Sequence, residues 1–479
     1  MIIASVFFYG SWNPIYIALI LASVIANFLI GRKLAASDPT TQRLWLMLGL
    51  CFNLGLLAYF KYAGFFVDNL NTIGNWLIPM PNITLPLAIS FFTFQQIAYL
   101  VDVARGECEE YQFRHYSLFV LFFPQLIAGP IVHHKEMMPQ FERLRSRDEL
   151  LPDLAVGLTI IAIGLFKKVV MADSLAEFAD PIFEAAGEGR QVSFFDSWVA
   201  TFAFSFQIYF DFSGYSDMAI GSARLFGIKL PENFRSPYKS VSIIEFWRRW
   251  HITLSRFLRD YLYITLGGNR DGRLKRYRNL FATMLLGGLW HGAAWTYVIW
   301  GGLHGMFLCV NHAWRALIQH SNPPKLFTQT WFRPLFILLT FVASALAFTV
   351  FRAPDLNSAI TIIAPGFVAG GAEVPLLLRG VIAESSLGQF LHAGGLENGS
   401  YAAVYCLLFL AAGICWLLPN TQEFMRGFSP VIRSVFSTEV SPALPAWRPG
   451  FVFAVTTAIL FSCSLLSLSS VTEFIYFQF

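Results

Sequence analysis

Long apolar runs, separated by short polar or turn-rich segments, are the main feature of the sequence. A helix that crosses a bilayer needs about 20 predominantly apolar residues, and many of the runs approach this length. We expect spans near residues 14–30, 44–60, 83–101, 154–171, 197–220, 279–297, 298–312, 334–351, 402–418 and 450–468. The pattern predicts an all-α polytopic membrane protein, a bundle of about ten or more transmembrane helices.

One apolar run differs from these spans. Segment 117–132 is shorter and contains Pro124, Gly129 and Pro130, which interrupt a regular helix. Broken backbone at membrane depth is tolerated where it is buried in protein or lines a cavity. We therefore expect this segment to be re-entrant.

The composition supports a membrane protein. The 479 residues are 56% hydrophobic and 13% charged, whereas soluble proteins have about 25% charged residues. Disordered chains are poor in hydrophobic and aromatic residues, so the same figures exclude disorder. A single integral-membrane domain over residues 1–479 accommodates the length. The net charge of +4 gives no reason to expect a nucleic-acid partner, and the expected surroundings are membrane lipid.

The basic residues are distributed unequally between alternate loops. Cytoplasmic loops of membrane proteins carry an excess of Lys and Arg. One set of loops holds 28 of these residues: 31–43, 102–116, 133–152, 224–278, 313–333 and 419–449. The opposing set holds 4: 61–82, 172–196, 352–401 and 469–479. The asymmetry predicts that the first set faces the cytoplasm.

The most basic loop, 224–278, has aromatic and basic residues at helical spacing. We expect an amphipathic interfacial helix, which is typical of a membrane surface. Its aromatic and basic residues include Trp247, Arg248, Arg249, Trp250 and Arg256. Two interpretations remain open: an anchor for lipid headgroups, or a cytoplasmic mouth that attracts a phosphate-bearing ligand.

Histidines supply the candidate chemistry. His291 lies in the apolar stretch "LLGGLWHGAAW", where Trp290 and Trp295 offer rigid aromatic walls, and His251 lies in the basic helix. Ionisable residues at membrane depth are costly and usually functional, although a histidine can also hydrogen-bond between helices. His304 lies 13 residues after His291, on another face unless the helix breaks at Gly301 and Gly302. We therefore favour a packing or supporting role for His304.

Other candidate groups are weaker. Asp211 and Asp217 lie near the end of an expected span, where helix capping and substrate contact are equally good interpretations. His133, His134 and Glu136 are close together, but their spacing matches no familiar ligand set. We therefore expect no metal site.

Four segments together resemble the membrane-bound O-acyltransferases. They are "FFPQLIAGPIV", "FQIYFDFSGYSDMAIGSARLFGIKLPENFRSPY", "FWRRWHITLSRFLRDYLYITLGGNR" and "NLFATMLLGGLWHGAAWTYVIWGGLHG". They occur in the family's order, and they are most similar to the bacterial branch that O-acetylates alginate, cellulose and peptidoglycan. The resemblance implies a helical bundle around a central tunnel, with a catalytic core at 83–312 and C-terminal helices at 334–479.

The resemblance also implies the reaction. His291 matches the family's catalytic histidine, and His251 matches the second histidine of this branch, in the acyl-donor region. The expected donor is a cytoplasmic thioester, acetyl-CoA or an acyl-carrier thioester, with no bound cofactor. The expected acceptor is a hydroxyl of an extracytoplasmic polysaccharide such as alginate, or a periplasmic acetyltransferase partner protein. Gln125 is expected in the tunnel wall, and the bacterial inner membrane is the expected location.

Two other functions remain open at this point. A lipid, peptidoglycan or teichoic-acid acyltransferase of the same superfamily would share these motifs. A transporter would also have broken helices and buried polar groups, but it would be expected to show an inverted repeat, and the sequence has none that we can recognise.

Overall fold

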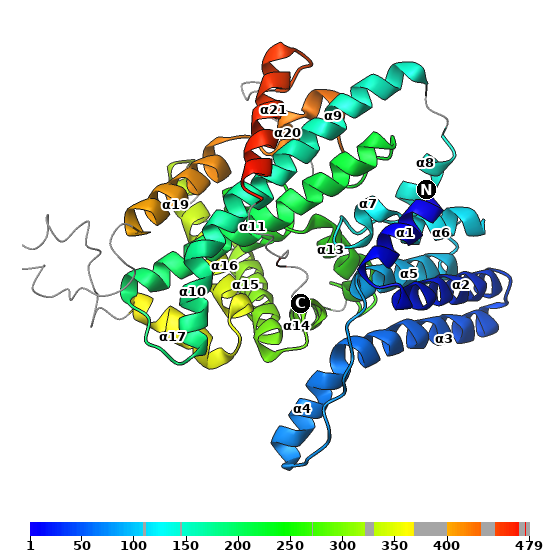
Figure 1. Ribbon diagram of the computed structural model, residues 1–479. Coiled ribbons are helices and arrows are strands. Elements are labelled where there is room, and N and C mark those ends of the chain that lie inside the picture. Colours follow the sequence, from blue (N-terminus) through cyan, green and yellow to red (C-terminus); the bar gives the residue numbers. More distant parts are fainter. Residues whose placement is uncertain are drawn as a thin grey trace, which may run out of the picture.

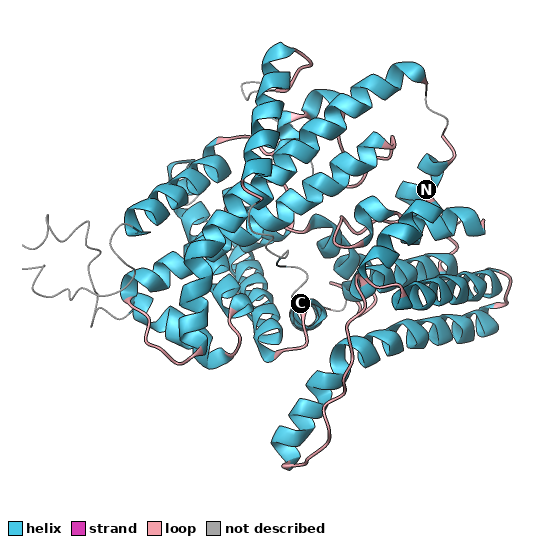
Figure 2. Cartoon of the chain, in the orientation of Figure 1, coloured by secondary structure: helices cyan, strands magenta, loops and turns pink. Residues whose placement is uncertain are grey.

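A computed structural model describes residues 1–108, 112–143, 146–270, 272–320, 330–367, 400–432, 446–468 and 475. This part of the chain forms helices and connecting loops and contains no strand, as Figure 2 shows. The prediction of an all-α protein is confirmed for the described residues.

The helices follow one another closely along the chain (Figure 1). The α-helices are α1 (Ile2–Trp12), α2 (Ile15–Ala35), α3 (Pro39–Leu57), α4 (Ala63–Gly74), α5 (Ile89–Ala104), α6 (Phe113–Leu121), α7 (Phe123–Leu126), α8 (His134–Phe141), α9 (Arg147–Leu165), α10 (Asp173–Gly187), α11 (Phe194–Leu225), α12 (Ile243–Trp247), α13 (Ile252–Phe257), α14 (Arg273–His291), α15 (Trp295–His320), α16 (Arg333–Arg352), α17 (Leu356–Ile363), α19 (Ser400–Leu417), α20 (Thr421–Phe424) and α21 (Phe451–Leu466). Three π-helical turns continue α3, α9 and α13: η1 (Ala58–Tyr62), η2 (Phe166–Ala172) and η4 (Leu258–Tyr263). Short 3₁₀ turns are η3 (Pro237–Lys239), η6 (Thr330–Phe332), η7 (Ala364–Phe367) and η8 (Arg426–Phe428).

Each of the ten expected spans overlaps a helix. Four helical segments within the described residues are long and apolar enough to cross a membrane: Ile15–Ala35, Pro39–Gly74, Arg147–Gly187 and Arg333–Arg352. Large apolar side chains on α3 and α21 are exposed, which suits contact with lipid. The count of ten or more transmembrane helices and the central tunnel stay predictions.

Helix α11 runs through the middle of the molecule, beside α9 (Figure 1). Lys168, in η2, forms ion pairs with Asp173 and with Asp211 of α11. Asp217, one and a half turns further along α11, pairs with Lys167. Both carboxylates of α11 therefore lie within the helix and hold η2 against it, and their position near the end of a membrane span stays a prediction.

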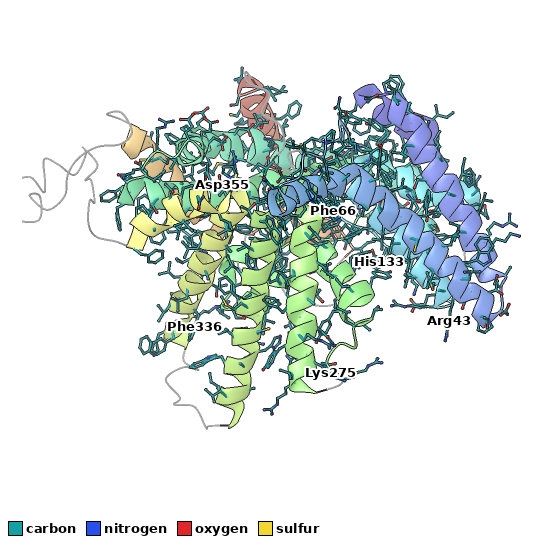
Figure 3. The ribbon with its side chains drawn as sticks, turned by 90° about the horizontal axis from the view of Figure 1, so that it is seen from below. Arg43, Phe66, His133, Lys275, Phe336 and Asp355 are labelled. Atoms are coloured by element: carbon teal, nitrogen blue, oxygen red, sulfur yellow. The ribbon has the colours of Figure 1, made fainter. Side chains whose placement is uncertain are left out.

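Helices α14 and α15 form a tight antiparallel hairpin. Figure 3 shows the two green helices side by side, with Lys275 near the start of α14, at the end opposite His291. A Cβ atom added at Gly288 would lie 2.2 Å from the Tyr297 carbonyl oxygen and 3.0 Å from the Gly301 Cα atom. The two backbones touch at these positions, as small residues allow in membrane helix pairs. The chain turns at 292–294, so the expected end of the first span at 297 is six residues too late and the expected start of the next at 298 is three residues too late.

The basic segment does not form the expected continuous interfacial helix. The chain leaves helical geometry after α12, and His251 takes a left-handed backbone conformation with φ 42° before α13 begins. Trp247 and Trp250 are buried in the aromatic core. The amphipathic spacing is real, but its aromatic face packs against α15 and α16 inside the protein. Its broken backbone aims His251 inward.

Segment 117–132 is broken, as its prolines predict. Helix α6 ends at Leu121, α7 is a single turn, and the following residues to Val132 form a loop. Nearly all of these side chains are buried. Burial in protein is the condition under which broken backbone is tolerated in a membrane, and the re-entrant path itself stays a prediction.

Candidate active site

His291 is the last residue of α14, and its side chain is buried among aromatic rings. The imidazole centroid lies 5.0 Å from that of Trp290, 5.1 Å from that of Trp300 and 5.4 Å from that of Phe351. Gly292 follows in extended conformation, so the helix ends directly beyond the imidazole. This placement leaves His291 at a chain turn in the centre of the bundle.

His251 approaches His291 from the broken basic segment. The two imidazole centroids lie 6.4 Å apart, with the rings inclined at 61°. The edge of Phe212, from α11, packs on His251 at a centroid distance of 4.7 Å. The fold therefore brings together the two histidines that the resemblance selects, although 40 residues separate them in the sequence.

The π-helical turn η1 holds the end of α14. The last carbonyl groups of a helix have no partner within it. The Lys61 ammonium donates to the carbonyl oxygens of Trp290, at 2.7 Å, and His291, at 3.0 Å. The Tyr62 hydroxyl donates to the Leu289 carbonyl oxygen at 2.8 Å. Adjacent residues of one turn thus cap three successive carbonyls, and a cation at this helix end is also favoured by the helix dipole.

A cavity of about 470 Å³ borders His291. Its aromatic walls include Trp12, Phe91 and Trp290, and its polar side chains are Ser11, Ser90, Lys61 and His291. The Lys61 ammonium also donates to the Ser90 hydroxyl at 3.2 Å. A mostly apolar cavity with a few convergent polar groups is the usual form of a small-molecule site.

His304 packs close to the two histidines and does not line this cavity. Its Nδ1 atom accepts a hydrogen bond from the Trp247 indole at 3.2 Å, and its ring lies parallel to that of Phe246. Trp300 lies between His304 and His291, about 5 Å from each by ring centroids. The geometry suits the supporting role that we favoured, but the break that separates the two histidines lies at Gly292 and not at Gly301.

Three residues predicted to line the substrate path do not border this cavity. Trp295 is 55% exposed, and its indole donates to Asn69, so it is not a wall beside His291. Gln125 is buried and donates to the Phe119 carbonyl oxygen, outside the cavity that His291 borders. Asp211 is held by Lys168, which makes it part of the packing between α11 and η2.

The basic side chains of the expected donor mouth are largely engaged by carboxylates. Arg249 pairs with Glu245 at 2.7 Å, and Arg256 forms a two-pronged pair with Glu136. Arg248 has an exposed side chain. These pairs reduce the positive potential that the sequence suggested, and donor binding by these residues stays a prediction.

A polar cluster surrounds Asp102 at the end of α5. His134 pairs with Asp102 at 3.2 Å, and the Tyr261 hydroxyl donates to the same carboxylate at 2.9 Å. Burial alone would lower the pKa of His134, but the hydrogen bond that its ring donates to the Asp102 carboxylate, together with the effects of Cys108 and of the Asp102 charge, raises the pKa to about 9. Burial, reinforced by the Arg256 charge, lowers the pKa of His133 to about 4. Within the described residues, no group of three His, Cys, Asp or Glu side chains is arranged to hold a metal ion.

The described part of the chain is helical and holds two buried histidines, one of which borders a cavity, and these are the parts of an enzyme that works within a bilayer. Residues 104–351 match the model of the membrane-bound O-acyltransferase family. The chain therefore belongs to this family, and it is an acyltransferase. The resemblance found in the sequence is confirmed, and a transporter is excluded as its class.

Named relatives include two from the expected branch and one outside it. The chain is 47% identical to the peptidoglycan O-acetyltransferase of Helicobacter pylori over 389 residues, which are 76% of this chain and 72% of the relative. It is 38% identical to the probable alginate O-acetylase AlgI of Pseudomonas aeruginosa over 506 residues, covering 100% of this chain and 94% of the relative. Identity to the teichoic acid D-alanyltransferase of Bacillus subtilis is 27% over 282 residues, which are 57% of this chain and 70% of the relative.

Sequence reasoning missed Lys61 and Tyr62. Lys61 was one of four basic residues in the loops assigned to the outer face. Its contacts with α14 join residues 229 and 230 positions apart. No local pattern carries information over that separation.

Proposed function

We propose that the protein transfers an acetyl group from a cytoplasmic thioester to a hydroxyl of an extracytoplasmic polysaccharide, or to a periplasmic partner protein. The observation that carries this proposal is the pair of buried histidines beside a cavity that one of them borders. The named relatives support acetyl as the acyl group, since both O-acetylase names describe acetyl transfer. They differ in polymer, so we propose a polysaccharide hydroxyl as the acceptor class.

In the proposed reaction His291 is the general base. Its imidazole takes the proton of the acceptor hydroxyl as the hydroxyl oxygen bonds to the thioester carbonyl carbon. The tetrahedral intermediate then collapses, the carbon–sulfur bond breaks, and the departing thiolate takes a proton from the imidazolium. The products are the ester and the free thiol, and His291 returns to its neutral form. A positioned base of this kind contributes typically about 10²–10⁴-fold.

The two reactants approach from opposite sides in this proposal. The charge asymmetry of the loops puts the start of α5, and with it the cavity, towards the outer face. The acceptor therefore enters the cavity, while the basic segment with His251 receives the donor from the cytoplasm. The inner membrane of a bacterium is the location that this arrangement requires.

The proposal is tested with the purified full chain in proteoliposomes. Acetyl-CoA with a labelled acetyl group is supplied on one side, and oligosaccharides of alginate or peptidoglycan on the other. We expect label on the oligosaccharide, or on an added periplasmic partner, only when protein is present. Transfer of a long-chain acyl group to lipid, and none to a saccharide or protein, would contradict the proposal. Transfer to one polymer would name the acceptor.

Lys61→Met provides a second expected outcome. The variant keeps a side chain of similar length but removes the ammonium that holds the carbonyl oxygens of Trp290 and His291. A misplacement of about 1 Å at a catalytic group can cost about 10²-fold, so we expect kcat to fall by roughly that factor. The KM for the donor should change little, because Lys61 borders the cavity assigned to the acceptor.

Two companion variants give this comparison its control. Lys61→Arg retains the positive charge and several donors, so it should recover part of kcat. Asn69→Ala removes an exposed hydrogen bond to Trp295 that joins the neighbouring elements α4 and α15, and it should leave transfer near the wild-type rate. Equal losses in Lys61→Met and Asn69→Ala would show that only general packing was disturbed.

A further inference from the structure

His251, Asn233 and Thr253 form a buried polar group whose hydrogen-bond directions can be worked out. All three side chains are about 1% exposed. The Asn233 Oδ1 atom lies 3.1 Å from His251 Nδ1, 2.8 Å from the Thr253 hydroxyl oxygen and 3.3 Å from the Thr253 backbone nitrogen. Buried polar groups are costly unless paired, so these contacts define one consistent pattern of donors and acceptors.

The pattern begins at the loop that follows α7. The backbone N–H of Ile131 donates to the Thr253 hydroxyl oxygen at 3.0 Å. A backbone N–H can only donate. The Thr253 hydroxyl therefore accepts on that side, and its own proton points to Asn233 Oδ1. The broken segment 117–132 is in this way linked to the histidine region.

The amide of Asn233 then has one possible orientation. The backbone N–H of Thr253 also donates to Oδ1, and the Asn233 Nδ2 group donates to the Ser216 hydroxyl of α11 at 3.1 Å. The atom that faces His251 Nδ1 is thus an oxygen, which can only accept. His251 must carry its proton on Nδ1, and the lone pair is on Nε2.

The backbone holds the two residues in register. The Ile252 N–H donates to the Asn233 carbonyl oxygen, and the Arg235 N–H donates to the Arg249 carbonyl oxygen, both at 2.9 Å. These bonds maintain His251 at φ 42°, a conformation that costs free energy for a residue other than glycine. Strain of this kind persists where surrounding contacts over-determine it.

We infer that Asn233 is a positioning residue that fixes His251 as the Nδ1–H tautomer, so that His251 presents Nε2 to the reaction as an acceptor of hydrogen bonds or protons. The consequence rests on the proposed function. A neutral His251 of this tautomer cannot donate a hydrogen bond from Nε2 to a thioester carbonyl. It instead accepts from the acceptor hydroxyl, or from the thiol released when the carbon–sulfur bond has broken, beside His291 at a ring-centroid distance of 6.4 Å.

The tautomer is tested directly by solid-state nitrogen-15 NMR. Histidine-labelled full-length protein is reconstituted in bilayers, and the His251 signals are those absent from His251→Gln. We expect a protonated Nδ1 and a bare Nε2, because protonated and bare ring nitrogens resonate far apart. A protonated Nε2 with a bare Nδ1 in the wild-type protein would overturn the inference, whatever the activity.

Two substitutions connect the tautomer to transfer. Asn233→Leu has similar volume and no acceptor, so the His251 spectrum should change, and kcat should fall by about 10–100-fold, as when an orienting partner of a histidine is lost. Asn233→Asp keeps the acceptor oxygen and should retain the Nδ1 proton and part of kcat. Unchanged kcat in Asn233→Leu would show that transfer does not depend on the His251 tautomer that Asn233 fixes, and would contradict a positioning role for Asn233. If Asn233→Leu does not fold, the wild-type spectrum still decides the tautomer.

The NMR measurement and the transfer assay test the role of Asn233 and the proposed function separately. A wild-type protein that shows the Nδ1–H tautomer but transfers no acetyl group to saccharide or protein would contradict the proposed function alone. Active protein with the opposite tautomer would contradict the role of Asn233 alone.

Discussion

Replacing His291 with glutamine is expected to lower acyl transfer by about 10²–10⁴-fold, the contribution typical of a general base. Glutamine is polar and close to histidine in size, but it cannot take a proton from a hydroxyl near neutral pH. The substitution retains a side chain between Trp290 and Trp300, so the protein should still reach the membrane. The measurement is transfer from labelled donor in proteoliposomes containing equal amounts of each protein.

His312→Gln is the matched control for this experiment. His312 lies on α15, more than two turns beyond His304, and its ring contacts Arg276. The same chemical change there should leave transfer close to the wild-type rate. If His291→Gln keeps near-normal transfer, the base is not His291, and His251 becomes the candidate. Loss of the folded protein in His291→Gln would show a structural role for the imidazole.

The positions of the helices could be predicted from the sequence because a long apolar run in a membrane protein can adopt few structures other than a helix. All ten expected spans overlap helices, and the broken character of 117–132 followed from its prolines. The structure of the basic segment could not be predicted in the same way. Its spacing of aromatic residues is helical, but backbone hydrogen bonds with residues 233 and 235 accompany a left-handed backbone conformation at His251. A period in the sequence records which residues share a face and does not show tertiary bonds that interrupt the helix.

The two histidines stood out in the sequence by their surroundings, but their pairing and their roles came from the resemblance to a family and not from spacing. Its distance of 6.4 Å depends on three chain segments that meet only in the folded state. The contacts of Lys61 and Asn233 were equally hidden in the sequence, because each joins residues that lie on different structural elements and meet only after folding. For Asp211 the sequence left a structural role and substrate contact equally open, and the structure pairs its carboxylate with Lys168.

The close contact of α14 and α15 yields the second large effect. In Gly288→Ala the new Cβ atom would be 2.2 Å from the Tyr297 carbonyl oxygen, which is much closer than a Cβ atom can approach another heavy atom. The neighbour is backbone, so no side-chain rotation relieves the clash, and the two helices must separate. Overpacking of this kind costs typically about 1–3 kcal/mol. We expect a lower midpoint of thermal unfolding in detergent.

The same separation should impair transfer, because His291 lies one turn after Gly288 and contacts Trp300 of α15. A shift of about 1 Å at the imidazole is expected to lower kcat by about 10²-fold, even in the fraction that stays folded. Gly302→Ala is the matched control on the partner helix, since its Cβ atom would meet only side-chain atoms, the nearest at 3.4 Å. Unchanged unfolding and unchanged transfer in Gly288→Ala would mean that the hairpin is looser than its backbone contacts require. His291 would then need another source of rigidity, which leaves the carbonyl contacts of Lys61 and Tyr62 as the structure that holds it.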